Sequence, residues 1–159
     1  MQAVVLCDVD SDKFSPLGRD LNPILLPIAE TRILAYTLEF LERGGVEDIM
    51  LICSRQTAEL QSYLSSTRWG ERGYPVKVRV VSAAAVHSTG DALREVDRLG
   101  LVKSDFVLIR GGVLSNLPLQ FMVEEHRRRK EDDKDALLMT IVLMQSNTQT
   151  AFSNKRYVP

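Results

Sequence analysis

Three carboxylates alternate along the loop that follows the first apolar segment of the chain, at Asp8, Asp10 and Asp12. Oxygen ligands at alternate positions are typical of calcium-binding loops, which also carry a glycine at the sixth position and a glutamate at the twelfth. This loop has neither of those two residues. We therefore predict that it binds no calcium.

The same loop is also poorly suited to phosphates. Loops that bind phosphates are usually rich in glycine, because bare backbone N–H groups can then approach the oxygens. Residues 8–14 contain no glycine, and Lys13 is their only basic residue. A triphosphate would meet side chains and negative charge there, which argues against nucleotide chemistry at this position.

Few other residues are candidates for chemistry. His87 could lie near a pocket at the edge of a sheet, but it precedes Ser88, Thr89 and Gly90 and fits better as a loop residue before a helix cap. His126 has no second histidine or cysteine at the spacing of metal ligands. No Ser/His/Asp or Cys/His set stands out either. We predict no catalytic, cofactor-binding or metal-binding residues.

Composition narrows the class of protein. The 159 residues carry a formal net charge of −1, so charge does not indicate nucleic acid or an anionic membrane as a partner. The apolar runs have the length of strands and Met1 leads directly into one, so we expect neither a membrane span nor a signal peptide. Cys7 and Cys53 end two of these runs. That position favours reduced core residues of a cytosolic protein over a disulfide or a metal site.

Apolar and amphipathic segments alternate along the chain. The apolar segments predict strands at residues 2–7, 48–53, 76–82, 105–110 and 136–144. The amphipathic segments predict helices at residues 31–43, 55–65, 90–99 and 119–131, with Ser54 capping the second and Ser88 or Thr89 the third. Continuous apolar strands indicate a parallel sheet that is covered on both faces. The predicted fold class is therefore α/β, a doubly wound, mostly parallel sheet with helices on both faces.

A dense run of charges occupies residues 124–135. Its four successive basic residues could contact phosphate or RNA, or the run could be the solvated end of a helix. The flanking acids neutralise the run, and cations suit a helix C-terminus, which favours the second interpretation. We expect residues 1–145 to form one domain and residues 146–159 a polar, mobile tail.

Several segments resemble a known family when they are taken in order. They are residues 20–27 (DLNPILLP), 36–41 (YTLEFL), 88–97 (STGDALREVD), 101–108 (LVKSDFVL) and 111–116 (GGVLSN). Together they resemble the Rossmann-like nucleotidyltransferase domain of sugar-1-phosphate pyrophosphorylases. They are most similar to that domain in the epsilon subunits of eukaryotic translation initiation factor 2B.

Some positions depart from the active enzymes. The resemblance implies a phosphate-binding lysine where this chain has Pro23, which carries no charge and no N–H. It also implies a metal-binding aspartate where this chain has Gly112; the epsilon subunits are similar to the active enzymes in keeping that aspartate. The enzymes' glycine-rich loop matches the carboxylate loop here, and their nucleobase contact matches Thr89 and Gly90. The degenerate family positions are Asp8, Asp10, Lys13, Pro23, Thr89, Gly90 and Gly112.

The resemblance implies a non-catalytic assembly domain in the guanine nucleotide exchange complex that acts on initiation factor 2. The implied partners are the other subunits of that complex, first the gamma subunit, and initiation factor 2 through the parent complex. No cofactor, direct nucleic-acid contact or membrane is implied, and the location would be cytoplasmic. We also expect the chain to self-associate, because it ends after the last predicted strand and leaves sheet edge and apolar surface uncovered.

Two alternatives remain. The chain could be a sugar-1-phosphate nucleotidyltransferase with a divergent phosphate loop, although an active enzyme would need the missing lysine and aspartate. It could also resemble the gamma subunit of the same factor, whose relatives keep a more glycine-rich first loop. The absence of glycine from residues 8–14 favours epsilon.

Overall fold

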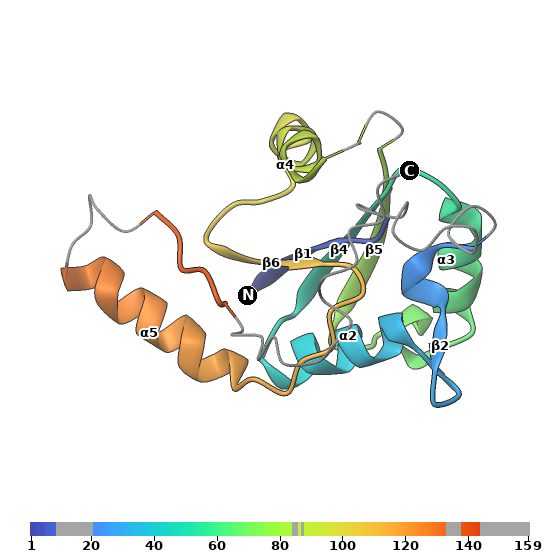
Figure 1. Cartoon of the computed structure of the whole chain (residues 1–159), viewed down its shortest axis with the longest axis horizontal. Helices are drawn as coiled ribbons and strands as arrows, with labels where there is room; N and C mark the ends of the chain where they lie inside the picture. The colour runs from blue at the N-terminus through green and yellow to red at the C-terminus, as the bar shows by residue number, and fades with distance from the viewer. Residues whose placement is uncertain (9–20, 84–85, 87, 133–137, 144–159) are drawn as a thin grey trace, which may run out of the picture. The chain divides into compact units, whose positions relative to one another are not determined.

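The computed structural model describes residues 1–8, 21–83, 86, 88–132 and 138–143 of the chain. The chain divides into two compact units, Met1–Gln120 and Phe121–Pro159. Figure 1 shows the helices and strands that make up the units.

A four-stranded parallel sheet in the order β5-β4-β1-β6 forms the centre of the first unit. Its register places Val4 of β1 between Met50 of β4 and Leu108 of β6. The strands are β1 (Gln2–Leu6), β4 (Asp48–Cys53), β5 (Lys77–Ser82) and β6 (Phe106–Arg110). Four of the predicted strands are thus confirmed to within one residue at each end.

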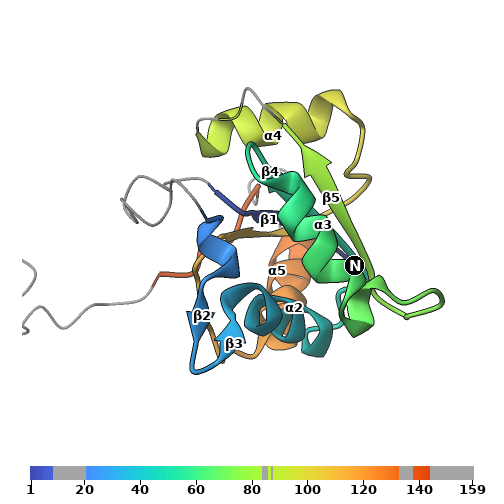
Figure 2. The ribbon, with the colours of Figure 1, turned by 90° about the vertical axis from the view of Figure 1, so that its right-hand side faces the viewer.

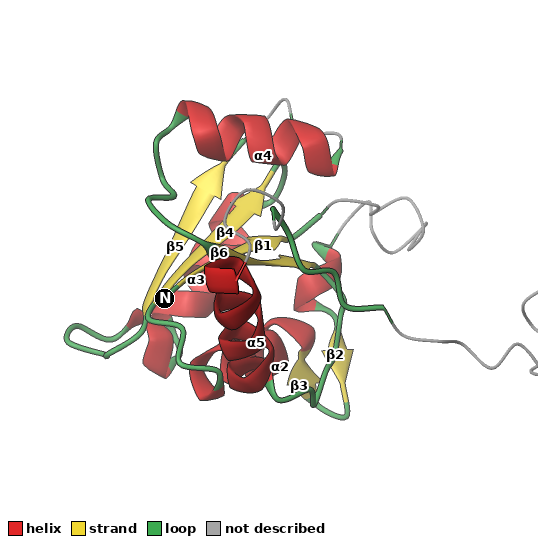
Figure 3. Cartoon of the chain, turned by 90° about the vertical axis from the view of Figure 1, so that its left-hand side faces the viewer, coloured by secondary structure: helices red, strands yellow, loops and turns green. Residues whose placement is uncertain are grey.

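Helices cover both faces of this sheet, as the apolar strands predict. On one face, Val4 and Met50 belong to a buried cluster that includes Ala92 and Val96 of α4 (Thr89–Arg98). On the opposite face lie α2 (Ile33–Arg43) and α3 (Thr57–Ser65) (Figures 2 and 3). The central strands β1 and β4 are buried on both sides, which explains why their sequences are continuously apolar. The doubly wound α/β fold is confirmed.

The sequence predicts caps for two helices, and the structure confirms one of them and contradicts the other. Ser88 caps α4, since its side chain accepts a hydrogen bond of 3.1 Å from the backbone N–H of Asp91. Ser54 does not cap α3. That helix begins at Thr57 after Gln56, whose φ is +56°, because the polar groups of Ser54 bind another residue, described below.

A short hairpin precedes α2 and was not predicted. It consists of β2 (Pro27–Ile28) and β3 (Thr31–Arg32), which pair antiparallel. Ala29 and Glu30 connect them with φ values of +48° and +67°. Two positive φ values fit a type I′ turn, in which Asn-Gly is the favoured pair. The sequence lacks that pair and therefore gave no indication of the hairpin. The described part of this unit also contains two 3-10 turns, η2 (Pro23–Leu25) and η3 (Arg68–Gly70).

Replacing this turn with the favoured residues should stabilise the protein. The double variant Ala29→Asn, Glu30→Gly should raise the free energy of unfolding by about 1 kcal/mol, because the left-handed conformation then costs less. Urea unfolding measures the change. Glu71→Gly is the control, since Glu71 has a φ of −71° and glycine gains nothing there. A loss of stability in the double variant would show that the turn is not strained.

The second unit contains most of α5 (Leu119–Asp132). Arg128 and Arg129 both contact Glu125, at 2.8 and 2.6 Å, and Arg128 also lies 3.3 Å from Asp132. The hydrogen bonds from Arg128 and Arg129 lower the pKa of Glu125 to about 2. These ion pairs support the interpretation of the charge run as the solvated end of a helix.

The predicted strand at residues 136–144 is wrong over residues 138–143, which form no regular secondary structure. A strand exists only where its backbone pairs with a neighbour, and no ladder between described residues includes this segment. Its apolar side chains are exposed, Leu138 and Leu143 most of all. Within the same unit, Nδ1 of His126 lies 2.9 Å from Oγ1 of Thr140. The predicted tail at residues 146–159 lies outside the described residues. No helix among the described residues has the length and apolar character to cross a membrane.

Candidate functional site

The carboxyl ends of β1, β4 and β6 mark the candidate site. The strand order reverses between β1 and β6, because β4 and β5 continue on one side of β1 while β6 lies on the other. In open α/β sheets, ligands bind outside the carboxyl ends of strands at such a point. The residues that follow the three strands there include Asp8, Ser54 and Gly111.

Asp8 is bound by the chain itself. One of its carboxylate oxygens, Oδ2, accepts hydrogen bonds from the backbone N–H of Ser54 at 2.8 Å, from the Ser54 hydroxyl at 2.8 Å and from the backbone N–H of Arg55 at 2.9 Å. The side chain is buried, with 8% of its surface exposed. Charge-assisted bonds of this kind are among the stronger hydrogen bonds in proteins. The negative charge of Asp8 therefore fixes the loop after β4 to the end of β1.

Cys53 links this carboxylate to further polar groups. The thiol of Cys53 lies 3.7 Å from Oδ2 of Asp8, donates to the carbonyl of Arg55 and accepts from the side-chain amide of Asn22 at 3.3 Å. Burial, and then the charge of Asp8, raise the pKa of Cys53 to about 12. Burial also raises the pKa of Cys7 well above its usual value. Both thiols are free and buried, as predicted, and they stay protonated at neutral pH.

Pro23 lies next to this cluster. The side chain of Asn22 accepts a hydrogen bond of 3.2 Å from the backbone N–H of Ile24 and caps η2, in which Pro23 is the first residue. Pro23 is buried and offers neither a charge nor an N–H. A phosphate near this turn would therefore find no cation at residue 23.

Glycine is required where β6 ends. The backbone N–H of Gly111 donates to the carbonyl of Leu6 at 2.6 Å, and a Cβ at residue 111 would lie 2.6 Å from that oxygen and 2.8 Å from the carbonyl oxygen of Cys7. Any side chain would push β6 away from β1. Gly112 has a φ of +80°. Residues other than glycine, asparagine and aspartate rarely adopt this backbone conformation.

The predicted site residues are only partly brought together. Asp8 and Pro23 both lie beside the Asn22 and Cys53 cluster, whereas Thr89 and Gly90 start α4. Asp10, Asp12, Lys13 and His87 lie outside the described residues. In the part of the chain that is described, no group of three or more histidine, cysteine, aspartate or glutamate side chains could hold a metal ion. Sequence reasoning missed the role of Ser54, because a serine before a helix resembles a cap.

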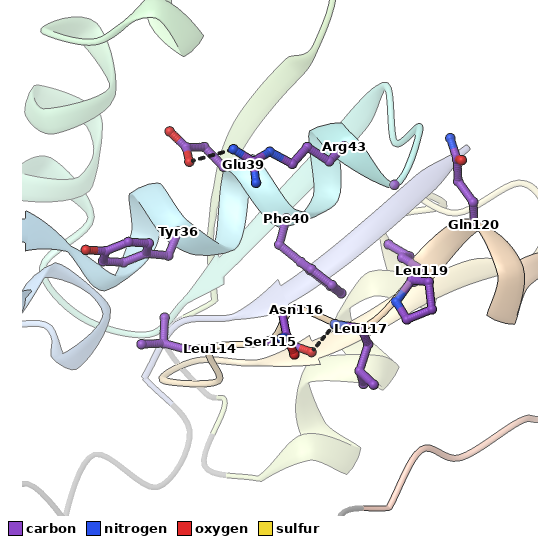
Figure 4. A pocket seen from close by; sticks show the side chains of 12 residues that line it. Tyr36, Glu39, Phe40, Arg43, Leu114, Ser115, Asn116, Leu117, Leu119 and Gln120 are labelled. Carbon is purple, nitrogen blue, oxygen red and sulfur yellow. Dashed lines mark hydrogen bonds and ion pairs between the residues drawn. The ribbon is translucent and has the colours of Figure 1, made fainter.

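A groove of about 570 Å³ runs along α2 and contains none of these residues. Tyr36, Glu39, Phe40 and Arg43 form its α2 wall, and residues 114–120 form the other (Figure 4). Leu119 closes the groove at Gly44, where an added Cβ would lie 2.4 Å from Cδ2 of Leu119. The groove is lined by apolar, polar and charged side chains.

The sequence of this chain is similar to those of known proteins. Over 142 residues, the chain is 39% identical to the translation initiation factor eIF2B subunit epsilon of Schizosaccharomyces pombe, covering 89% of this chain and 21% of that protein. It is 31% identical over 132 residues to subunit gamma of the same factor in the same organism, covering 79% of this chain and 27% of that protein. The chain thus spans about a fifth to a quarter of the length of these relatives.

Solved structures support the fold. A putative glucose-1-phosphate thymidylyltransferase from Bacillus anthracis superimposes with a TM-score of 0.69 at 20% identity, over 82% of this chain and 52% of that one. At such low identity the likeness concerns the fold alone. The family model described as Nucleotidyl transferase matches residues 2–152, nearly the whole sequence. The chain therefore belongs to the nucleotidyl transferase family.

Proposed function

We propose that this chain is a non-catalytic nucleotidyltransferase-like domain of an eIF2B epsilon subunit, and that it helps to assemble the guanine nucleotide exchange complex that acts on initiation factor 2. The greater identity to subunit epsilon than to subunit gamma supports this assignment. Catalysis of exchange then belongs to the parent complex, in the cytoplasm, and not to this domain.

The observation that carries the non-catalytic part of the proposal is the buried carboxylate of Asp8. An active site for nucleoside triphosphates needs a surplus of positive charge and free N–H groups at the switch point. Here Asp8 brings a negative charge and occupies the N–H groups of Ser54 and Arg55. Pro23 and Gly112 supply neither a cation nor a metal ligand. A sugar-1-phosphate nucleotidyltransferase, the alternative function, would need both.

The proposed first partner is the gamma subunit. An epsilon subunit that carries this domain should co-purify with the gamma subunit of the same organism. Replacing residues 1–145 with the matching part of an active sugar-1-phosphate nucleotidyltransferase should reduce the recovery by about tenfold or more, because the fold is kept and the contact surface is lost. Equal recovery of gamma with both versions would refute the assembly role.

We also propose that the isolated chain self-associates. The strand β6 lies at the edge of the sheet, and Phe106 and Leu108 on it are each 37% exposed. Further apolar side chains are exposed at Val113, Leu114 and Leu117. Open strand edges and apolar patches recruit other chains. Sedimentation at about 1 mM, a concentration at which even weak pairs form, tests this, and a clean monomer there contradicts it.

A further inference from the structure

The groove along α2 has features of an interface. Figure 4 shows Phe40 pointing from α2 toward residues 115–117, while Glu39 and Arg43 lie along one edge of the groove. Leu114 and Leu117 on the facing wall are 46% and 44% exposed. An apolar centre with a charged rim is the usual anatomy of a protein interface.

The charges on the rim are self-complementary. Glu39 and Arg43 lie one turn apart, about 6 Å along the helix axis, and their side chains are 41% and 84% exposed. The distance between their charged groups within one chain is 4.0 Å, which is long for an ion pair. Glu39 also lies 3.6 Å from Arg68. A second α2 packed antiparallel, with a two-fold axis passing near residue 41, would set Glu39 of each copy opposite Arg43 of the other.

The shape of the helix end fits the same arrangement. In that register, Tyr36 of one copy faces the end of the other α2, near the exposed Gly45, which has no side chain. Leu119 covers Gly44, so the tyrosine ring would lie against Gly45. A two-fold interface requires a surface that complements itself in this way.

We propose that two copies of this chain associate through the α2 groove about a two-fold axis, with their α2 helices antiparallel and Glu39 of each paired with Arg43 of the other. The proposal rests on the proposed self-association and assigns its surface. It competes with pairing through the exposed edge of β6.

A mixing experiment tests the arrangement. In Glu39→Lys the rim is wholly basic, and in Arg43→Glu it is wholly acidic, so each variant should self-associate about tenfold or more weakly than the wild type. An equimolar mixture should recover the wild-type affinity to within about threefold, because both cross-pairs are then attractive. A parallel pairing would set like residues opposite one another, so neither variant would bind more weakly than the wild type and the mixture would bind more tightly. Pairing through β6 would leave all three samples alike. Sedimentation equilibrium of the whole chain measures all three samples.

Matched variants keep the outcomes separate. Glu59→Lys, the same charge change on the exposed side of α3, should leave self-association within about twofold, and so should Leu108→Lys on β6. Leu117→Lys should weaken it as strongly as the rim variants. Thermal melting checks that each variant folds. A monomeric wild type would overturn the proposed self-association itself. A dimeric wild type that loses its affinity with Leu108→Lys, but not with Leu117→Lys or the rim variants, would overturn only the α2 surface.

Discussion

Replacing Asp8 with alanine is expected to lower the free energy of unfolding by about 3 kcal/mol. The substitution removes the acceptor of three hydrogen bonds and leaves the N–H groups of Ser54 and Arg55 without it. A buried donor that loses its partner costs its full desolvation energy. Since single domains are stable by only about 5–15 kcal/mol, this loss is a large fraction of the total. Urea unfolding of the whole chain gives the value.

Two further variants isolate the cause. Asp8→Asn keeps an acceptor oxygen but not the charge, and should cost about half as much. Asp97→Ala removes an exposed carboxylate from α4 and should change stability by less than about 0.5 kcal/mol. If Asp8→Ala were as stable as Asp97→Ala, Asp8 would have no structural role, and its carboxylate would again be a candidate for function.

Restoring the family aspartate at residue 112 is expected to leave the chain without nucleotidyltransferase activity. Gly112→Asp supplies one metal ligand, yet Pro23 still carries no cation and Asp8 still occupies the backbone N–H groups at the strand ends. Each stabilising group in such a site is worth about 10²–10³ in rate, and groups that act as a unit are not additive. Release of nucleoside triphosphate from sugar nucleotides and pyrophosphate is the assay.

The backbone adds a second effect to this variant. Gly112 has a φ of +80°, so the aspartate should also cost about 1 kcal/mol of stability. Gly100→Asp is the matched control, because Gly100 has a φ of +59° and open space around its Cβ position. Excess magnesium should raise the melting temperature of neither variant. Turnover in Gly112→Asp, or stabilisation of it alone by magnesium, would show that a metal site persists here.

Much of the fold could be predicted from the sequence because the signals were local. The strands β1 and β4 are continuously apolar, and burial on both faces requires that pattern. Ser88 before α4 caps the helix, as its position predicts. In both cases the residue type and its near neighbours decide the structure.

The predictions failed where the local structure depends on more than the residue types nearby in the sequence. Ser54 has the position of a cap, but Asp8, 46 residues away, binds its hydroxyl and its N–H. The hairpin at Ala29 and Glu30 adopts positive φ values without the residues that favour them. Residues 138–143 have the composition of a strand, but composition cannot supply the neighbouring backbone that a strand requires. The site followed the same rule: the substitutions Pro23 and Gly112 could be read from the sequence, whereas the hydrogen bonds of Asp8 required the fold.

Titration calorimetry with nucleoside triphosphates and magnesium tests the central claim, a nucleotidyl transferase fold without nucleotide chemistry, most directly. The purified chain should give no binding heat with ATP, GTP, CTP, UTP or dTTP, and an active sugar-1-phosphate nucleotidyltransferase measured in parallel should bind its own substrate. Asp8 supplies negative charge where a triphosphate would need positive charge, so we expect no dissociation constant below about 1 mM. A dissociation constant of about 10 μM or lower for any of these nucleotides would contradict the account.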